Sequence, residues 1–308
     1  MPIPWDHRRD REGGRLVYPV LSRRSGGLSL GVNLFPYGKV CAFDCPYCEI
    51  FLEATSEPVP GADSLIAALE REFAYFLDRG YAEAWAPAPV RDICISGNGE
   101  PTMSPSLGEA VRLCSSLKAS RPGILSSASL VLITNSTGFL DPATRALLED
   151  ACREKGLVIW AKLDAGSEAR FRLMSGSDVG LERIADGLLS FARRSSVIVQ
   201  TMLCEVDGIG PSDADIADYA GLLSRLAEEG ARIGEAHLYT FSRPSPGGRC
   251  VALADEALLR AAAFVRGATG LRVRVFGLDA ELRSSPAESP RSSDRGPVGP
   301  LHPEETGR

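Results

Sequence analysis

The stretch Cys41-Ala-Phe-Asp-Cys45-Pro-Tyr-Cys48 constrains this chain more than any other part of it. Three cysteines spaced C-x3-C-x2-C follow an apolar run, and this spacing suits three thiolates that converge on three irons of one 4Fe-4S cubane. The fourth iron is then left without a protein thiolate. Because an open metal position is where a substrate or cofactor binds and is activated, the motif indicates a reactive cluster.

Other uses of these cysteines fit the sequence less well. A structural zinc site takes four ligands, and the three histidines, His7, His237 and His302, lie far from the motif in sequence. A disulfide leaves one of three clustered cysteines unpaired, and the sequence shows no apolar signal segment. A chance cluster among eight cysteines is the remaining alternative.

Composition bounds the class of protein. With 308 residues and 44% hydrophobic content, the chain is able to bury a substantial core. It contains no apolar run of about 18 residues, so we expect no membrane span and a cytoplasmic location. Residues 1–24 carry six arginines and three acidic residues. Because the net charge of the whole chain is −6, the remaining residues are acidic overall. An acidic core is not typical of a nucleic-acid binder.

Apolar runs alternate with amphipathic stretches, which predicts strands alternating with helices. We expect strands at residues 28–35, 90–96, 130–134, 157–163, 197–203, 236–241 and 271–276. We expect helices at residues 64–80, 107–119, 142–154, 180–194, 213–229 and 254–266. Buried strands rich in Val and Ile between helices favour an α/β fold with a parallel sheet, either a barrel or an open doubly wound sheet.

Three parts are expected along the chain. Residues 1–27 are predicted to be a short basic N-terminal arm, and residues 28–281 the single core domain. Residues 282–308 are rich in Ser, Pro, Gly and Arg with almost no large apolar side chains, which is typical of a disordered tail.

Glycines follow the second core strand in the sequence Gly97-Asn98-Gly99-Glu100. Glycines after a buried strand let backbone amides and carbonyls approach a ligand that side chains would otherwise block. In a parallel α/β fold the carboxyl ends of the strands hold the site, so this turn is expected there. Taken alone, the same residues favour a plain tight turn.

Polar residues also end the later strands. Asn135 ends the third core strand, where a helix N-cap is the alternative role. Lys162 and Asp164 lie two residues apart after the fourth strand, so they share a face, either lining a pocket or forming a structural ion pair. Gln200, inside the fifth strand, and Arg243, after the sixth, are further candidates with structural alternatives.

The cysteine spacing, with Tyr47 before the third cysteine, resembles the signature of the radical S-adenosylmethionine (radical SAM) superfamily. The resemblance implies a partial (β/α)6 TIM-type barrel. It also implies that Cys41, Cys45 and Cys48 hold a 4Fe-4S cluster whose open iron is chelated by S-adenosylmethionine (SAM). One electron from that cluster would cleave SAM to a 5′-deoxyadenosyl radical, which abstracts hydrogen from a substrate.

The family's SAM-binding motifs have counterparts in this sequence. The turn Gly97, Asn98, Gly99 and Glu100 resembles the GGE motif whose backbone holds the SAM amino group, with Asn98 in place of a glycine. By the same resemblance, polar residues at strand ends contact the SAM ribose and carboxylate. These contacts are carried over to Asn135 and Asp164.

Residues 28–245 are most similar to the radical SAM branch that includes the wyosine-base enzymes of tRNA. The tRNA-modifying members use cysteines upstream of the signature for a second cluster, and here no cysteine precedes Cys41, so one cluster is expected. The expected partners are an electron donor such as flavodoxin or ferredoxin and a small-molecule or RNA substrate. An activase that places a radical on a partner protein and a non-catalytic iron-sulfur barrel are the alternatives.

Overall fold

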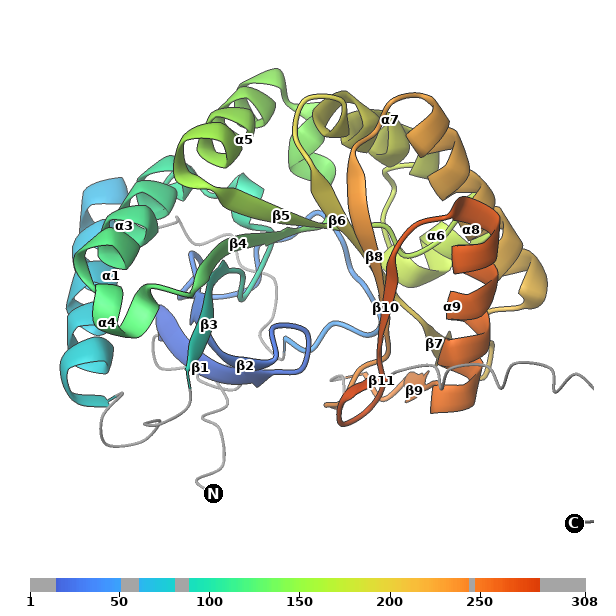
Figure 1. The fold of residues 1–308 in the computed structure, drawn as a ribbon, viewed down its shortest axis with the longest axis horizontal. Helices are drawn as coiled ribbons and strands as arrows, with labels where there is room; N and C mark the ends of the chain where they lie inside the picture. The colour runs from blue at the N-terminus through green and yellow to red at the C-terminus, as the bar shows by residue number, and fades with distance from the viewer. Residues whose placement is uncertain (1–14, 51–60, 81–88, 244–246, 283–308) are drawn as a thin grey trace, which may run out of the picture.

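A computed structural model of the protein describes residues 15–50, 61–80, 89–243 and 247–282. The described residues form a nine-stranded sheet in the order β1-β2-β3-β4-β5-β6-β8-β10-β11. Figure 1 shows the sheet curled into an arch, with β1 and β2 near one foot and β10 and β11 near the other. This arch is a half-barrel, and its concave side faces a single interior.

The strands of the large sheet are short. Their bounds are Val17–Ser22 (β1), Gly27–Val32 (β2), Val90–Ile95 (β3), Ser129–Thr134 (β4), Leu157–Lys162 (β5), Val197–Met202 (β6), Ile233–Tyr239 (β8), Val273–Phe276 (β10) and Glu281–Leu282 (β11). All pairings from β2 to β10 are parallel, whereas β1 and β11 pair antiparallel at the two edges. A separate two-stranded ribbon joins β7 (Cys204–Val206) to β9 (Cys250–Ala252).

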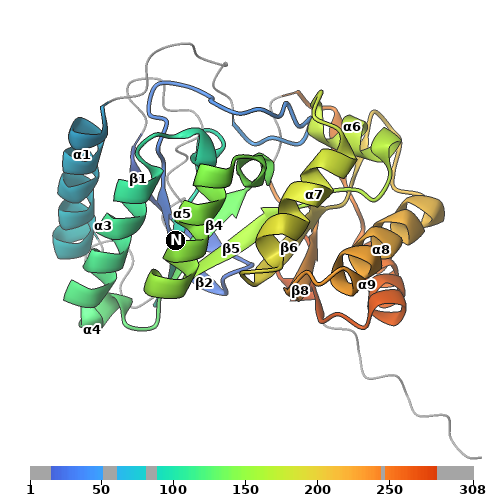
Figure 2. The same ribbon diagram turned by 90° about the horizontal axis from the view of Figure 1, so that it is seen from above.

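Helices cover the convex face of the sheet (Figure 2). They are α1 (Ala62–Tyr75, continued by the π-helix Phe76–Gly80), α3 (Leu107–Ser120), α4 (Pro122–Leu125), α5 (Pro142–Lys155), α6 (Glu168–Ser175), α7 (Leu181–Ala192), α8 (Asp213–Glu228) and α9 (Asp255–Thr269). Local sequence explains several ends: Ser212 and Asp215 form a capping box before α8, and Gly156 and Gly270 end α5 and α9 in left-handed conformations.

The two faces of each parallel strand have different surroundings. On β3, Ile93 and Ile95 are fully buried in the core beneath the helices, while Cys94 packs inside the arch against Val131 and Trp160. Because both faces of such strands are covered, they read as continuous apolar runs. The sheet therefore has a helix-facing core and a smaller interior cluster.

The predicted fold class is confirmed. Six parallel strands, from β2 to β8, follow one another in sheet order as the partial barrel required, and β10 is the expected last strand. Strand β1 lies within residues 1–27, the segment expected to be a basic arm, and β11 includes Leu282, the first residue of the expected tail. Residues 1–14 and the predicted tail, 283–308, lie outside the described residues.

The described helices include none with the length and apolar character needed to cross a lipid bilayer.

Candidate active site

A cavity of about 310 Å³ lies inside the arch, at the ends of the strands where the predicted motifs meet. The predicted residues that line it are Cys41, Cys45, Cys48, Gly97, Gly99, Glu100 and Asn135. They come from the loop after β2 and from the ends of β3 and β4. Parallel strands bring their carboxyl ends to one edge, which is why segments distant in sequence converge here.

The cysteine loop is fastened to the end of β3 through Val40. The backbone N–H of Val40 donates to the carbonyl of Asn98 at 3.1 Å, and the N–H of Glu100 donates to the carbonyl of Val40 at 2.8 Å. Further along the loop, the N–H of Asp44 donates to the carbonyl of Ser175 at 2.8 Å. These bonds fix the loop that carries the cysteines just before the motif and in its middle.

The close backbone contact between Val40 and the turn after β3 requires a glycine at position 99. A Cβ at this position would lie 2.0 Å from the carbonyl oxygen of Val40, so no side chain fits. Gly97 has φ +127°, and a Cβ there would lie 2.7 Å from Oδ1 of Asn33. The sequence predicted that a ligand approaches the backbone at these glycines. In the structure other parts of the chain, Val40 and Asn33, make this close approach, although both glycines also line the cavity.

The thiols lie in a protected environment. Burial raises the pKa of Cys41, and burial, followed by the Asp164 carboxylate, raises the pKa of Cys45 to about 12. Two N–H groups point at the sulfur of Cys41: the backbone N–H of Phe43 at 3.4 Å and the side-chain amide of Asn135 at 3.6 Å. Hydrogen bonds of this kind stabilise a thiolate once a metal has displaced its proton.

The donor set suits a cubane better than a single ion. Within the described ranges, no group of three or more His, Cys, Asp or Glu side chains is close enough to hold one metal ion. A cubane places each thiolate on a different iron, so its three cysteines surround the cluster and do not meet at one point; Cys41, Cys45 and Cys48 line one cavity. The residues present therefore fit a 4Fe-4S cluster.

Glu100 ties β3 to β4 beneath this cavity. Its buried carboxylate accepts hydrogen bonds from the hydroxyls of Thr102 and Thr134, each at 2.7 Å, and from the backbone N–H of Asn135 at 2.6 Å. Burial raises the pKa of Glu100, and these hydrogen bonds oppose that shift. The carboxylate thus positions the backbone of Asn135.

Asn135 bonds the start of the following 3₁₀ turn, Thr137–Leu140. Its Oδ1 accepts hydrogen bonds from the backbone N–H of Thr137 at 3.0 Å and from the Thr137 hydroxyl at 2.6 Å. Its Nδ2 faces the sulfur of Cys41. The bonds to Thr137 therefore orient the amide towards the cysteine loop, and a contact with SAM stays a prediction.

The chain is similar in sequence to several proteins. No known protein-family profile matches the chain. A UPF0026 protein of Helicobacter pylori (strain 26695) is 27% identical over 265 residues, which is 83% of this chain and 76% of that protein. A UPF0026 protein of Synechocystis sp. is 29% identical over 200 residues, covering 61% of this chain and 64% of that protein.

Among solved structures, a radical SAM methyltransferase from Sphaerobacter thermophilus aligns with a TM-score of 0.54 at 15% identity, covering 85% of this chain and 69% of that chain. This chain shares its fold with that enzyme. The fold implied by the cysteine motif is confirmed. A structure of TYW1 with a lysine-pyruvate adduct aligns less well, with a TM-score of 0.49 at 16% identity over 78% of this chain and 73% of that one.

Two residues predicted to contact the cofactor are not among those that line the cavity. Asn98 is fully buried and donates from Nδ2 to the carbonyl of Phe35 at 3.2 Å. Asp164 accepts a hydrogen bond from the hydroxyl of Tyr47 and another from the backbone N–H of Met202, the latter at 2.7 Å. Both side chains bond the protein itself, and a contact of either residue with a cofactor stays a prediction.

Asp164 also forms the ion pair that the sequence offered as its alternative role. Its Oδ1 lies 3.2 Å from Nζ of Lys162, which does line the cavity. Burial lowers the pKa of Lys162, but Asp164 and Tyr239 raise it by more, so the net shift is upward and the ammonium is retained. Lys162 also donates to the hydroxyl of Tyr239 at 2.7 Å.

Several lining residues were missed from the sequence. They include Tyr18 and Arg24 from the β1–β2 hairpin, Trp160 from β5 and Tyr239 from β8. Tyr18 packs over Gly31, where a Cβ would lie 2.1 Å from its ring, and its hydroxyl is 3.0 Å from Oγ of Ser96. The period-two pattern of β1 was the available signal, because it places Tyr18, Val20 and Ser22 on one face.

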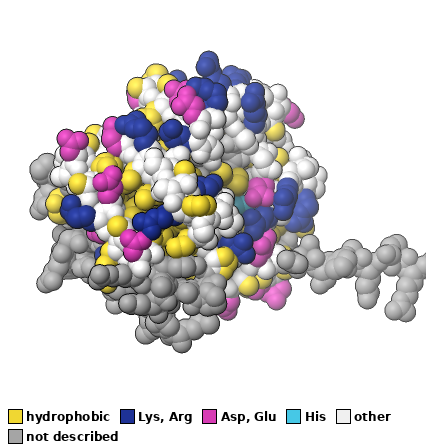
Figure 3. Space-filling model, turned by 60° about the vertical axis from the view of Figure 1, so that its left-hand side comes forward, with side chains coloured by type: hydrophobic (Ala, Val, Ile, Leu, Met, Phe, Trp, Pro, Cys, Tyr) yellow, Lys and Arg dark blue, Asp and Glu magenta, His cyan; other side chains and the backbone are white. Residues whose placement is uncertain are grey.

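A larger hollow of about 970 Å³ lies at the opposite end of the strands, lined by the starts of β5, β6 and β8. Its arginines are largely matched by acids, as in the Arg194–Glu149 pair at 3.7 Å and the Arg272–Glu235 pair at 3.5 Å. Figure 3 likewise shows basic and acidic side chains interspersed over one face of the molecule. The cysteine-lined cavity, which has the reactive groups, is therefore the better candidate for chemistry.

Proposed function

We propose that this protein is a radical SAM enzyme. The observation that carries the proposal is that Cys41, Cys45 and Cys48 line one cavity together with Gly97, Gly99, Glu100 and Asn135, at the strand ends of a radical SAM fold. Cytoplasmic location, one 4Fe-4S cluster and SAM as cofactor follow from the same assignment.

The three cysteines would hold the cluster. When bound, the cluster supplies one electron for the reductive cleavage of SAM, which yields the 5′-deoxyadenosyl radical that abstracts a hydrogen atom from the substrate. The chain's own contribution at the cysteines is to shield the thiols in part from solvent and to aim the N–H groups of Phe43 and Asn135 at Cys41.

The residues nearest the expected cofactor are assigned by position. We assign SAM to the side of the cavity lined by Gly97, Gly99, Glu100 and Asn135, which retains four of the six residues inferred from the sequence. Asp164 is assigned a supporting role instead: it holds Tyr47 of the cysteine loop and balances Lys162. The buried walls keep water away from a reactive intermediate.

The substrate is not identified by these residues. An RNA nucleoside, as in the wyosine branch, and a small molecule are the two candidates, and the electron donor would be a flavodoxin or ferredoxin. An activase acting on a partner protein and a non-catalytic iron-sulfur barrel are distinct alternatives. Stoichiometry separates them, because only an enzyme forms 5′-deoxyadenosine in step with a modified substrate.

The test is SAM turnover under anaerobic conditions. Reconstituted protein, reduced with dithionite and supplied with SAM, is expected to release 5′-deoxyadenosine, whereas the Cys48→Ala protein is expected to release none. A folded, iron-loaded protein that forms no 5′-deoxyadenosine with any cell extract would contradict the proposal. Comparing nucleosides and metabolites from cells with and without the gene then addresses the substrate.

A further inference from the structure

Arg24 is a cation that the β1–β2 hairpin brings into the cysteine-lined cavity. Its guanidinium carbon lies 4.8 Å from the ring centroid of Tyr239 and 5.4 Å from that of Trp160. Its Nη1 donates a hydrogen bond to Oε1 of Gln200, in the middle of β6. Contacts with aromatic faces and one amide oxygen fix the plane of the guanidinium.

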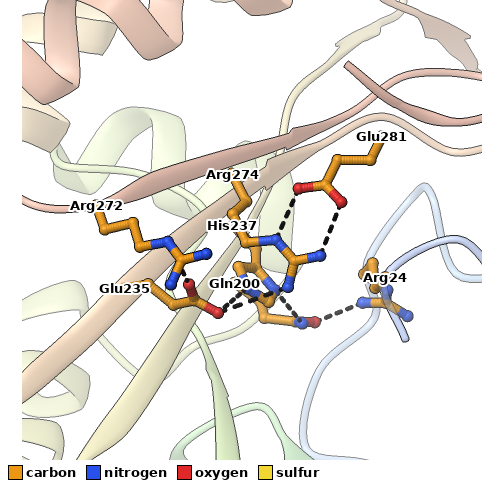
Figure 4. A network of polar contacts seen from close by, with 7 residues as sticks. All are labelled: Arg24, Gln200, Glu235, His237, Arg272, Arg274 and Glu281. Carbon is orange, nitrogen blue, oxygen red and sulfur yellow. Dashed lines mark hydrogen bonds and ion pairs between the residues drawn. The ribbon is translucent and has the colours of Figure 1, made fainter. Parts of the chain in front are cut away.

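A chain of hydrogen bonds behind Gln200 fixes the direction of that contact (Figure 4). Nε2 of His237 lies 2.8 Å from Oε1 of Glu235, and Nδ1 of His237 lies 3.2 Å from Nε2 of Gln200. Since a carboxylate only accepts, the His237 proton is on Nε2, and Nδ1 must accept from the Gln200 amide. The Gln200 oxygen is thereby turned towards Arg24.

The titration state of His237 is consistent with this chain. Burial lowers the pKa of His237 to about 4, against the opposing influence of Glu235. The groups that face it from neighbouring strands are Gln200 on β6 and Phe276 and Arg274 on β10. The imidazole is therefore neutral near pH 7, as an accepting Nδ1 requires.

The other cations of the cavity are already matched by acids. Lys162 pairs with Asp164 at 3.2 Å, and Arg243 pairs with Glu49 at 2.8 Å. Arg24 forms no ion pair with any residue in the described part of the chain; Asp92, the carboxylate whose pKa it influences, accepts instead from the hydroxyl of Ser29. A guanidinium has five N–H donors, and the described residues accept from one of them.

We infer that Arg24 binds an oxyanion of the substrate, a carboxylate or a phosphate. This inference rests on the proposed function, because it takes the cavity to be the active site. A partly buried guanidinium that pairs with no acid among the described residues attracts an anion more strongly than an exposed one, and its fork matches two oxygens at once. Gln200, His237 and Glu235 act through Arg24 and are positioning residues.

SAM also carries a carboxylate, but its place is expected near the cysteines. Arg24 comes from the β1–β2 hairpin and the cysteines from the loop after β2, so the two groups reach the cavity from different segments. The guanidinium contacts Tyr239, Trp160 and Gln200 and none of the three cysteines. We therefore assign it to the substrate, and SAM binding becomes a control.

Trp160 provides a direct readout of anion binding. The other tryptophans, Trp5 and Trp85, are replaced by Phe so that emission reports on Trp160 alone, beside Arg24. Inorganic phosphate and acetate are the probes, titrated at constant ionic strength with chloride. We expect a saturable change with at least one probe; phosphate alone indicates a phosphorylated substrate, and acetate alone a carboxylate.

Variants decide whether Arg24 is responsible. Arg24→Gln is expected to weaken the response at least tenfold, and Arg24→Lys, which keeps the charge but not the fork, by less. Arg23→Gln is the matched control, because Arg23 bonds the carbonyls of Leu278 and Thr240 and does not line the cavity, so its response is expected to equal that of the parent.

Two results would overturn the inference. One is the absence of a saturable response to either probe, or an equal response from a folded Arg24→Gln protein. The other is a tenfold loss of SAM affinity in Arg24→Gln by equilibrium dialysis, which would assign Arg24 to the cofactor. Neither measurement requires SAM cleavage. Failure of the proposed function is detected in a different experiment, as an absence of 5′-deoxyadenosine from the unsubstituted protein.

Discussion

The cysteine side and the arginine side of the cavity are built in different ways. The cysteine side consists of Cys41, Cys45 and Cys48 with the glycines after β3, and local backbone bonds through Val40 hold it together. The arginine side consists of Arg24, Trp160 and Tyr239 and depends on side chains from β6 and β8 behind them. One side is a loop fastened by its backbone, and the other is a side-chain network.

The two sides of the cavity are therefore expected to be sensitive to different changes. A backbone-fastened loop fails when a side chain intrudes, whereas a buried polar network fails when a charge is removed or a proton is added. Asp164 serves both sides, since it bonds Tyr47 in the cysteine loop and pairs with Lys162 in the cavity. The substitutions below test this division in order of expected effect.

Asp164→Asn is expected to have the largest effect on stability. Removing the carboxylate leaves the Lys162 ammonium buried without an acidic partner, which costs about 3–5 kcal/mol for a broken buried pair. Urea unfolding measures the loss. The control is Asp150→Asn, whose partner Arg153 is exposed, where a change within about 0.5 kcal/mol is expected. Equal effects of the two substitutions would show that Asp164 is not the shared support.

Gly99→Ala tests the cysteine side alone. A Cβ 2.0 Å from the Val40 carbonyl forces the cysteine loop away from β3, and we expect a loss of about 3 kcal/mol together with lower iron content. The matched control is Gly221→Ala in α8, where a Cβ meets nothing within 4 Å and a gain of about 0.5–1 kcal/mol is expected. An unchanged midpoint of thermal unfolding in Gly99→Ala would contradict the packing reason for this glycine.

The sequence predicted the cysteine side far better than the arginine side. Cys41 to Cys48 and Gly97 to Glu100 are contiguous motifs, so the chemistry could be inferred before the fold was known. Arg24, Gln200 and His237 come from three separate elements: strand register pairs Gln200 with His237, and Arg24 reaches Gln200 from the β1–β2 hairpin. Even at the cysteine side, the sequence could not show that the side chains of Asn98 and Asp164 form hydrogen bonds within the protein and do not face the cavity. Residue spacing predicts which face of a strand a side chain lies on, but it does not identify the group that the side chain bonds.

His237 gives the smallest and most selective effect, through pH. Its pKa of about 4 in the folded protein lies below the ordinary 6.5, so protonation favours unfolding. The stabilising contribution is complete above pH 6.5 and is lost as pH falls towards 4, by roughly 3 kcal/mol. Urea unfolding at several pH values should show a shallower pH dependence in His237→Asn. An identical pH dependence in both proteins would contradict a neutral, buried His237.

The central claim is that Cys41, Cys45 and Cys48 hold one cluster, and iron content tests it most directly. After anaerobic reconstitution, we expect about four irons and four sulfides per unsubstituted chain. Cys114→Ala, which removes a fully buried thiol on α3 outside the cavity, is expected to keep them. Cys45→Ala is expected to lose the cluster and SAM cleavage together. Full iron retention by a folded Cys45→Ala protein would contradict the account.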